Sequence, residues 1–235
     1  MAQEKKVYTS FHEIPVREYM YFPKGTIEVG KPGRFSKIEI MHILVSILVL
    51  TIAFSFWLSG GLIFNRDISL IVNSLPYAFA GALTAFFFHE MSHKFMAQKF
   101  GLWAEYRVFP MGLVLALGLS VFTGVVFAAP GAVMFMGGSR YYETGKIALA
   151  GPLSNILVAF VSFLLYSYVF FGTQIGVLVG FICLINSFLA AFNLLPFGPL
   201  DGVKIIKWNA TAWILLFISS IILVVLIFPK FSLVI

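Results

Sequence analysis

Long runs of apolar residues constrain this chain more than any other feature of its sequence. One run covers residues 40–58, about 19 residues, which is enough to cross a bilayer as a helix. Further runs cover 74–100, 147–171, 174–193 and 210–228, and hydrophobic residues make up 60% of the 235 residues against 11% charged. A soluble domain of this length does not carry so much apolar surface. We therefore predict an all-α polytopic membrane protein with about five to six transmembrane helices.

Basic residues lie at the borders of these runs, where an excess of Lys and Arg indicates the cytoplasmic side. Residues 1–38 are predicted to form a short basic cytoplasmic segment ahead of a transmembrane domain at 39–235. The first apolar run follows almost forty polar residues, so we expect no signal peptide and a prokaryotic cell membrane as the location. The net charge of +6 is scattered and not gathered on one face, so no nucleic-acid partner is expected.

Residues 108–137 are mostly apolar but rich in Gly and Pro. A full span here would put Arg140 and Lys146 outside, against the charge rule. A re-entrant element, which could be a β-hairpin, keeps Arg107, Arg140 and Lys146 on the inner side. We expect the re-entrant path, buried against other helices or lining a wet cavity, because lipid does not tolerate exposed irregular backbone.

The pattern His89-Glu90-Met91-Ser92-His93 lies inside one of the apolar runs. A helix predicted from Ser74 and Pro76 to about residue 100 puts both histidines on one face, where each can offer a ring nitrogen to one Zn²⁺. Glu90 lies about 100° further round the helix and can act as a general base on water. The alternatives are a chance match or core histidines bonded to backbone carbonyls, but ionisable residues inside a membrane are functional by default.

A catalytic zinc needs a third protein ligand, and Asp201 is the carboxylate that returns to the apolar core at the right depth. It follows Pro196 and Pro199, which we expect to break the helix that carries it. Under the re-entrant path, Asp201 and the histidines approach the same cytosolic side. The alternative for Asp201 is a capping or interfacial aspartate.

Three motifs together resemble the site-2 protease family of intramembrane zinc metalloproteases. They are the histidine motif above, then Gly151-Pro152-Leu153-Ser154-Asn155, then Asn193-Leu194-Leu195-Pro196-Phe197-Gly198-Pro199-Leu200-Asp201-Gly202. They occur in the family's order and define a catalytic core at about 74–208. The family's membrane-embedded strands between the first two motifs also fit the glycine-rich stretch, whereas the PDZ-like and CBS-like modules of some relatives are not found.

The resemblance implies a role for each motif residue. His89, His93 and Asp201 would hold one Zn²⁺ per chain, Glu90 would be the general base, and Asn193 would position substrate or stabilise the oxyanion. Asn155 would either contact substrate or be a packing residue hydrogen-bonded across the bundle. Pro196 and Pro199 would either leave space for water at the aspartate or only end the helix.

The sequence therefore predicts an endopeptidase that cleaves transmembrane segments of membrane proteins within the lipid bilayer, with its active site toward the cytoplasm. Two other functions remain open at this point: a metal-ion transporter that uses the same three ligands, and a non-catalytic relative that binds membrane helices. The intact Glu90 argues against the second. Zinc peptidases with a glutamate as third ligand are disfavoured, since no glutamate follows Glu143. The oligomeric state and the natural substrate are not predicted.

Overall fold

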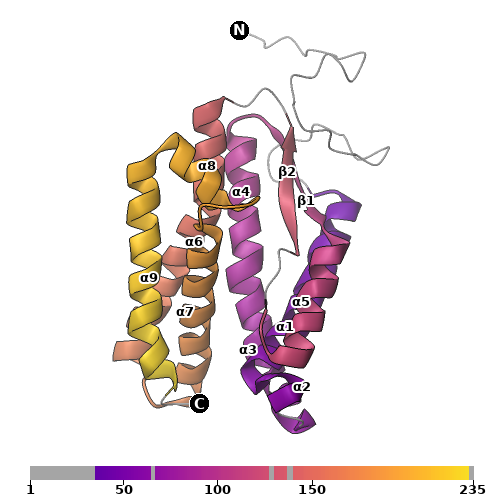
Figure 1. Ribbon diagram of the computed structural model, residues 1–235, viewed down its shortest axis with the longest axis vertical. Helices are drawn as coiled ribbons and strands as arrows, with labels where there is room; N and C mark the ends of the chain where they lie inside the picture. The colour runs from indigo at the N-terminus through magenta and orange to yellow at the C-terminus, as the bar shows by residue number, and fades with distance from the viewer. Residues whose placement is uncertain (1–34, 65–66, 127–129, 137–139, 233–235) are drawn as a thin grey trace.

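The computed structural model describes residues 35–64, 67–126, 130–136 and 140–232 (Figure 1). Within them, five helices are long and apolar enough to cross a membrane, as predicted: Lys37–Ile63, Ile68–Lys99, Tyr141–Tyr168, Gln174–Asn193 and Ala210–Phe231. The basic segment predicted at 1–38 lies almost wholly outside the described residues.

Helix α1 (Lys37–Ser59) forms most of the first span. The Ser36 side chain caps its start by accepting a hydrogen bond from the Glu39 backbone N–H at 3.1 Å. Gly60 ends it in the left-handed conformation, with φ of 83°, and the short helix α2 (Gly61–Phe64) follows.

The second span is one long rod made of α3 (Ile68–Gly81), a π-helical segment η2 (Ala82–Phe87) and α4 (Phe88–Lys99). The predicted start at Ser74 and Pro76 is wrong. Asp67 caps the helix by accepting from the Ser69 N–H at 2.8 Å, and Pro76 lies inside. Membrane helices tolerate an internal proline because neighbouring groups satisfy the freed carbonyl. The π segment, a feature that often marks functional sites, comes directly before the histidine motif.

The segment between the second and third spans has the predicted re-entrant path, but it is not a simple β-hairpin. Strands β1 (Trp103–Val108) and β2 (Gly131–Met136) are antiparallel, with Trp103 opposite Met136, so both ends lie together. Helix α5 (Pro110–Thr123) lies between them. Pro110 suits the first turn of a helix, and the Leu-rich residues after it favour continuing one.

The far end of the re-entrant element is fastened to the end of α1. Gly124, with φ of 69°, lies against Gly60 and Gly61, so close that a Cβ on Gly61 or Gly124 would overlap the other backbone. Since α5 also packs along α1, the element runs the length of that helix before the chain returns to β2 (Figure 1).

The C-terminal half contains α6 (Tyr141–Tyr168), α7 (Gln174–Asn193), α8 (Asp201–Trp208) and α9 (Ala210–Ser232). The bounds of α7 agree with the prediction, while α6 begins six residues before the predicted 147. Pro196 and Pro199 do not break a helix. They lie in the turn after α7 has ended at Asn193, and Asp201 is the first residue of α8.

Helix α4 lies at the centre of the fold. It packs against β1 and β2 on one side and against α6 on the other, and Figure 1 shows it between the sheet and the group formed by α6 to α9. This position brings residues of α4, β2, α6 and α8 to one interior region.

Candidate metal centre

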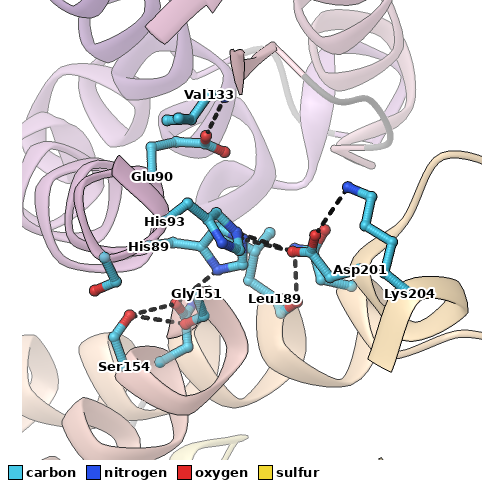
Figure 2. Close-up of polar contacts among 12 residues, drawn as sticks. His89, Glu90, His93, Val133, Gly151, Ser154, Leu189, Asp201 and Lys204 are labelled. Carbon is cyan, nitrogen blue, oxygen red and sulfur yellow. Dashed lines mark hydrogen bonds and ion pairs between the residues drawn. The ribbon is translucent and has the colours of Figure 1, made fainter. Parts of the chain in front are cut away.

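Helix α4 carries His89, Glu90 and His93 into the interior, and each of these residues is less than a tenth exposed. Asp201 is equally buried and reaches them from the first turn of α8 (Figure 2). The turn after α7 makes this meeting possible because it folds the start of α8 back, so that Gly202 lies against the Leu194 carbonyl.

Three side chains converge with ligand atoms inside one small volume. His93 Nε2 lies 3.0 Å from His89 Nε2, and Asp201 Oδ2 lies 2.9 Å from His93 Nε2 and 3.4 Å from His89 Nε2. Tetrahedral zinc with bonds of about 2.0–2.1 Å separates its ligand atoms by roughly 3.3 Å. The three atoms therefore fit a single zinc ion with little movement, and such a His, His, Asp group could hold a metal.

The opposite nitrogen of each imidazole has a hydrogen-bond acceptor. His89 Nδ1 lies 3.0 Å from Asn155 Oδ1, and His93 Nδ1 lies 2.7 Å from the Ile147 carbonyl. We assign the proton to Nδ1 in both rings, because a carbonyl oxygen can only accept. Each Nε2 then presents its lone pair to the shared volume, as metal-binding histidines do.

Asn155 lies behind His89 and is fully buried on α6. Its Nδ2 donates to the Ala85 carbonyl of the π segment at 3.0 Å, which identifies Oδ1 as the atom that faces His89. Both polar ends of this side chain are engaged within the bundle.

Gly151, one turn before Asn155, lets α6 approach the two histidines. A Cβ at this position would overlap Nε2 of His93 and approach Cε1 of His89. The glycine of the second motif is therefore explained by close packing of α6 against the imidazoles.

Glu90 points toward the sheet. Its Oε2 accepts a hydrogen bond from the Val133 backbone N–H on β2 at 3.0 Å, as Figure 2 shows. The carboxylate is thus held beside the three ligands but bonded to none of them.

A cavity of about 150 Å³ opens beside these groups. His89, Glu90, His93 and Asp201 line it together with β2 and the end of α7. Asn193 and Pro199 also line it, whereas Pro196 does not. The Asn193 amide donates to the Leu189 carbonyl of its own helix at 3.0 Å.

Several residues at or near this centre were not predicted from the sequence. Lys204, one of the basic residues near the ends of the apolar runs, lines the cavity with its Nζ 3.4 Å from Asp201 Oδ1. Lys94, which directly follows His93, is fully buried in an ion pair with Glu39, which is also fully buried. The i, i+4 spacing of Glu90 and Lys94 signalled that both face one side of α4, but nothing in the sequence identified Glu39 as the partner.

Two curated proteins are similar to this chain. "Putative zinc metalloprotease MJ0611" of Methanocaldococcus jannaschii is 39% identical over 181 residues, which cover 77% of this chain and 89% of that protein. "Putative zinc metalloprotease YwhC" of Bacillus subtilis is 29% identical over 168 residues, or 61% of this chain and 73% of that protein. No family model matches the chain, and no solved structure matches it.

Proposed function

This chain belongs to the family of zinc metalloproteases that includes the Methanocaldococcus jannaschii protein, and from this membership we propose that it is an intramembrane endopeptidase of the site-2 protease type. One observation carries the proposal. A metal-competent His89, His93 and Asp201 group, with Glu90 beside it, is buried among helices long and apolar enough to span a membrane. Its substrates would be transmembrane segments of other proteins.

In this proposal His89, His93 and Asp201 hold one zinc ion per chain. Two neutral imidazoles and one carboxylate form a donor set that leaves a fourth position open, as in catalytic zinc sites. When bound, zinc acts as a Lewis acid toward the scissile carbonyl and makes water nucleophilic at neutral pH.

Glu90 is the proposed general base. Its carboxylate accepts a proton from the attacking water in the cavity and later gives that proton to the nitrogen of the leaving amine. Its position one residue after His89 keeps it on the same turn of α4 as the metal ligands, so the two functions share a rigid support.

The edge of β2 that faces away from β1, where the Val133 N–H donates to Glu90, is the proposed docking place for substrate. A transmembrane helix hides its carbonyls in its own hydrogen bonds, so a segment has to unwind before it is cut. An unwound segment pairs with an exposed strand edge by β-augmentation. Residues 130–133 and Phe135 border the cavity, which supports an extended peptide lying between β2 and the metal centre.

Asn193 is the proposed oxyanion donor. Asn193 lines the cavity, and its Nδ2 is bonded only to a carbonyl of its own helix among the described contacts, so the amide is able to turn toward a developing negative charge. Asn155 is proposed to position His89, and Pro199 to shape the cavity wall next to Asp201. Pro196 is proposed to prevent α7 from extending past Asn193.

The protein is further proposed to lie in a prokaryotic cell membrane, with its N-terminus and active site toward the cytoplasm. The basic residues of the sequence support this orientation. In this scheme the ends of β1 and β2 that adjoin α4 and α6 lie on the cytoplasmic side.

The test is cleavage of a panel of model transmembrane substrates by purified protein in detergent and in liposomes, with bound zinc measured in each sample. We expect the parent to cut and Glu90→Gln to retain zinc without cutting. Glu143→Gln, which changes a glutamate at the start of α6, is the matched control and keeps cutting. Zinc flux into the same liposomes, with cleavage absent, would instead identify a transporter, and absence of zinc from the parent would overturn the ligand set.

A further inference from the structure

Helix α4 has a second functional face beside the histidines. Glu90 and Lys94 are four residues apart, as His89 and His93 are, so the two pairs form adjacent stripes on one helix. The histidine stripe faces Asp201 and α6. The other stripe faces the two-stranded sheet, and neither the family nor the metal centre explains the lysine in it.

Lys94 forms a completely buried ion pair with Glu39 of α1, and both side chains are 0% exposed. Its Nζ also lies 4.0 Å from the centroid of the Phe35 ring. Burying two charges is costly, and such pairs are poor sources of stability compared with apolar packing. A pair like this is better explained by what it holds in place.

Glu39 ties α4 to the sheet through its other oxygen. Oε1 accepts a hydrogen bond from the Tyr106 backbone N–H on β1 at 2.9 Å. Tyr106 stands directly opposite Val133 in the antiparallel register. The Val133 N–H points the other way and donates to Glu90 Oε2 at 3.0 Å.

One cross-strand pair is therefore held from both outer edges by carboxylates that are each fixed to α4. Glu90 belongs to α4 itself, and Glu39 is joined to α4 by Lys94. Because the Tyr106 and Val133 amides bond outward, they are a non-hydrogen-bonded pair of the ladder. Two links therefore set where β2 lies along α4. One is the hydrogen bond from Val133 to Glu90, and the other, here called the tether, runs from Tyr106 through Glu39 to Lys94.

We propose that Glu39 and Lys94 are positioning residues that fix the register of β2 against Glu90, and so select which peptide bond of a docked substrate reaches the metal centre. This inference rests on the proposed function. Equivalent backbone groups recur every second residue along a strand, at about 6.6–6.8 Å. If the tether is lost, β2 and its docked peptide can settle at more than one position, and cleavage spreads to neighbouring bonds.

The experiment compares three double variants of the full chain. Glu39→Leu with Lys94→Met removes both charges and the tether without leaving an unpaired ion. Glu39→Gln with Lys94→Gln keeps an acceptor for the Tyr106 amide and a neutral hydrogen bond to α4, so it serves as the conservative rescue. Glu105→Leu with Arg107→Met removes an ion pair on β1 that does not involve α4.

Cleavage sites are mapped by mass spectrometry, and zinc content and thermal stability are measured on each sample. We expect the Leu and Met variant to keep its zinc, to cut at two or more bonds and to lose about tenfold in kcat/KM. The Gln pair restores the single parental bond, and the β1 control keeps that bond whatever its stability. If the Leu and Met variant does not fold, Glu39→Gln with Lys94→Met replaces it with the same expectation. A folded, zinc-loaded tether variant that cuts only the parental bond overturns the inference.

A second readout does not depend on cleavage. In a Glu90→Gln background with the buried Cys183 replaced by Ala, a cysteine at the exposed position Ala132 of β2 is cross-linked to a series of single-cysteine substrates. We expect one preferred substrate position, and a spread of positions once the tether is removed. If the preferred substrate position is unchanged after Glu39 and Lys94 are replaced, their positioning role is wrong, while the proposed function still stands. If the parent neither cuts nor cross-links any substrate, the proposed function and this inference both fail.

Discussion

The side-chain oxygen of Asn155 lies 3.0 Å from Nδ1 of His89, so an amide on α6 fixes the rotation of an imidazole on α4. The same amide donates to the Ala85 carbonyl, which ties this contact to the π segment. The contact predicts how the metal centre responds when it is removed.

Asn155→Ala is expected to weaken zinc binding by about 10–100-fold, the usual effect of losing an outer hydrogen bond to a metal-binding histidine. Zinc affinity is measured by competition with a chromogenic chelator. Asn186→Ala is the control, because Asn186 is also fully buried and bonds to Thr84, next to Ala85, but touches no ligand. Equal zinc affinity in Asn155→Ala and the parent would refute the positioning role of Asn155.

Gly151→Ala is expected to abolish high-affinity zinc binding, since the new Cβ would occupy the space of His93 Nε2. Zinc content after dialysis against limiting metal measures the effect. Gly118→Ala on α5 has open space around its Cβ and is expected to leave zinc unchanged. A Gly151→Ala protein with parental zinc content would show that α6 retreats from α4 at little cost.

Removing the metal is expected to lower the thermal stability of the parent in detergent. A ligand that binds only the folded state stabilises by about 2.7 kcal/mol at a free concentration 100 times its Kd. His93→Ala lacks one ligand nitrogen and Asp201→Asn lacks the negative charge of the carboxylate, so their Tm should respond far less to a zinc chelator. Asp67→Asn, outside the centre at the start of α3, should respond as the parent does. An identical Tm loss in all four proteins would mean that the chelator acts elsewhere.

Asn193→Ala is expected to reduce kcat by about 10²–10³-fold, as removal of an oxyanion donor does, with zinc content and KM nearly unchanged. Kinetics on a fluorogenic transmembrane substrate measure this. The control is Asn209→Ala, which removes a cap that accepts from the Ala212 N–H at the start of α9 and lies away from the cavity. If KM rises while kcat stays constant, Asn193 binds substrate and does not stabilise charge.

Much of the fold could be predicted from the sequence because bilayer thickness imposes a length on each apolar run. The bounds of α7 agree residue for residue, and the charge rule predicted the re-entrant path between β1 and β2. The internal form of that element could not be predicted, since its strands gain partners only when residues about thirty apart in the chain meet. The predicted helix start at Ser74 and Pro76 was wrong because the helix begins earlier, at the Asp67 cap, in the short polar interval between two apolar runs.

The candidate centre likewise contains residues that could be predicted from the sequence and residues that could not. His89, His93 and Asp201 stand out because ionisable residues are rare in apolar runs, and the structure brings their ligand atoms together. Glu39 stands just before the first run, where charges are ordinary, and Lys94 stands near the end of the second run, so their burial as a pair could be recognised only once α1 and α4 were placed in the fold. Gly151 required the positions of both imidazoles.

The two stripes of α4, Glu90 with Lys94 and His89 with His93, place contacts for two different ligands on one helix. In the proposed function, a peptide paired with β2 would act on α4 through Glu90 and the Glu39 tether, while a zinc ion would act on it through the histidines. Thermodynamic linkage then requires reciprocity: whatever factor zinc applies to the affinity for peptide, peptide applies to the affinity for zinc. Under this proposal, the effect of substrate on zinc affinity and the effect of zinc on substrate affinity measure one coupling free energy.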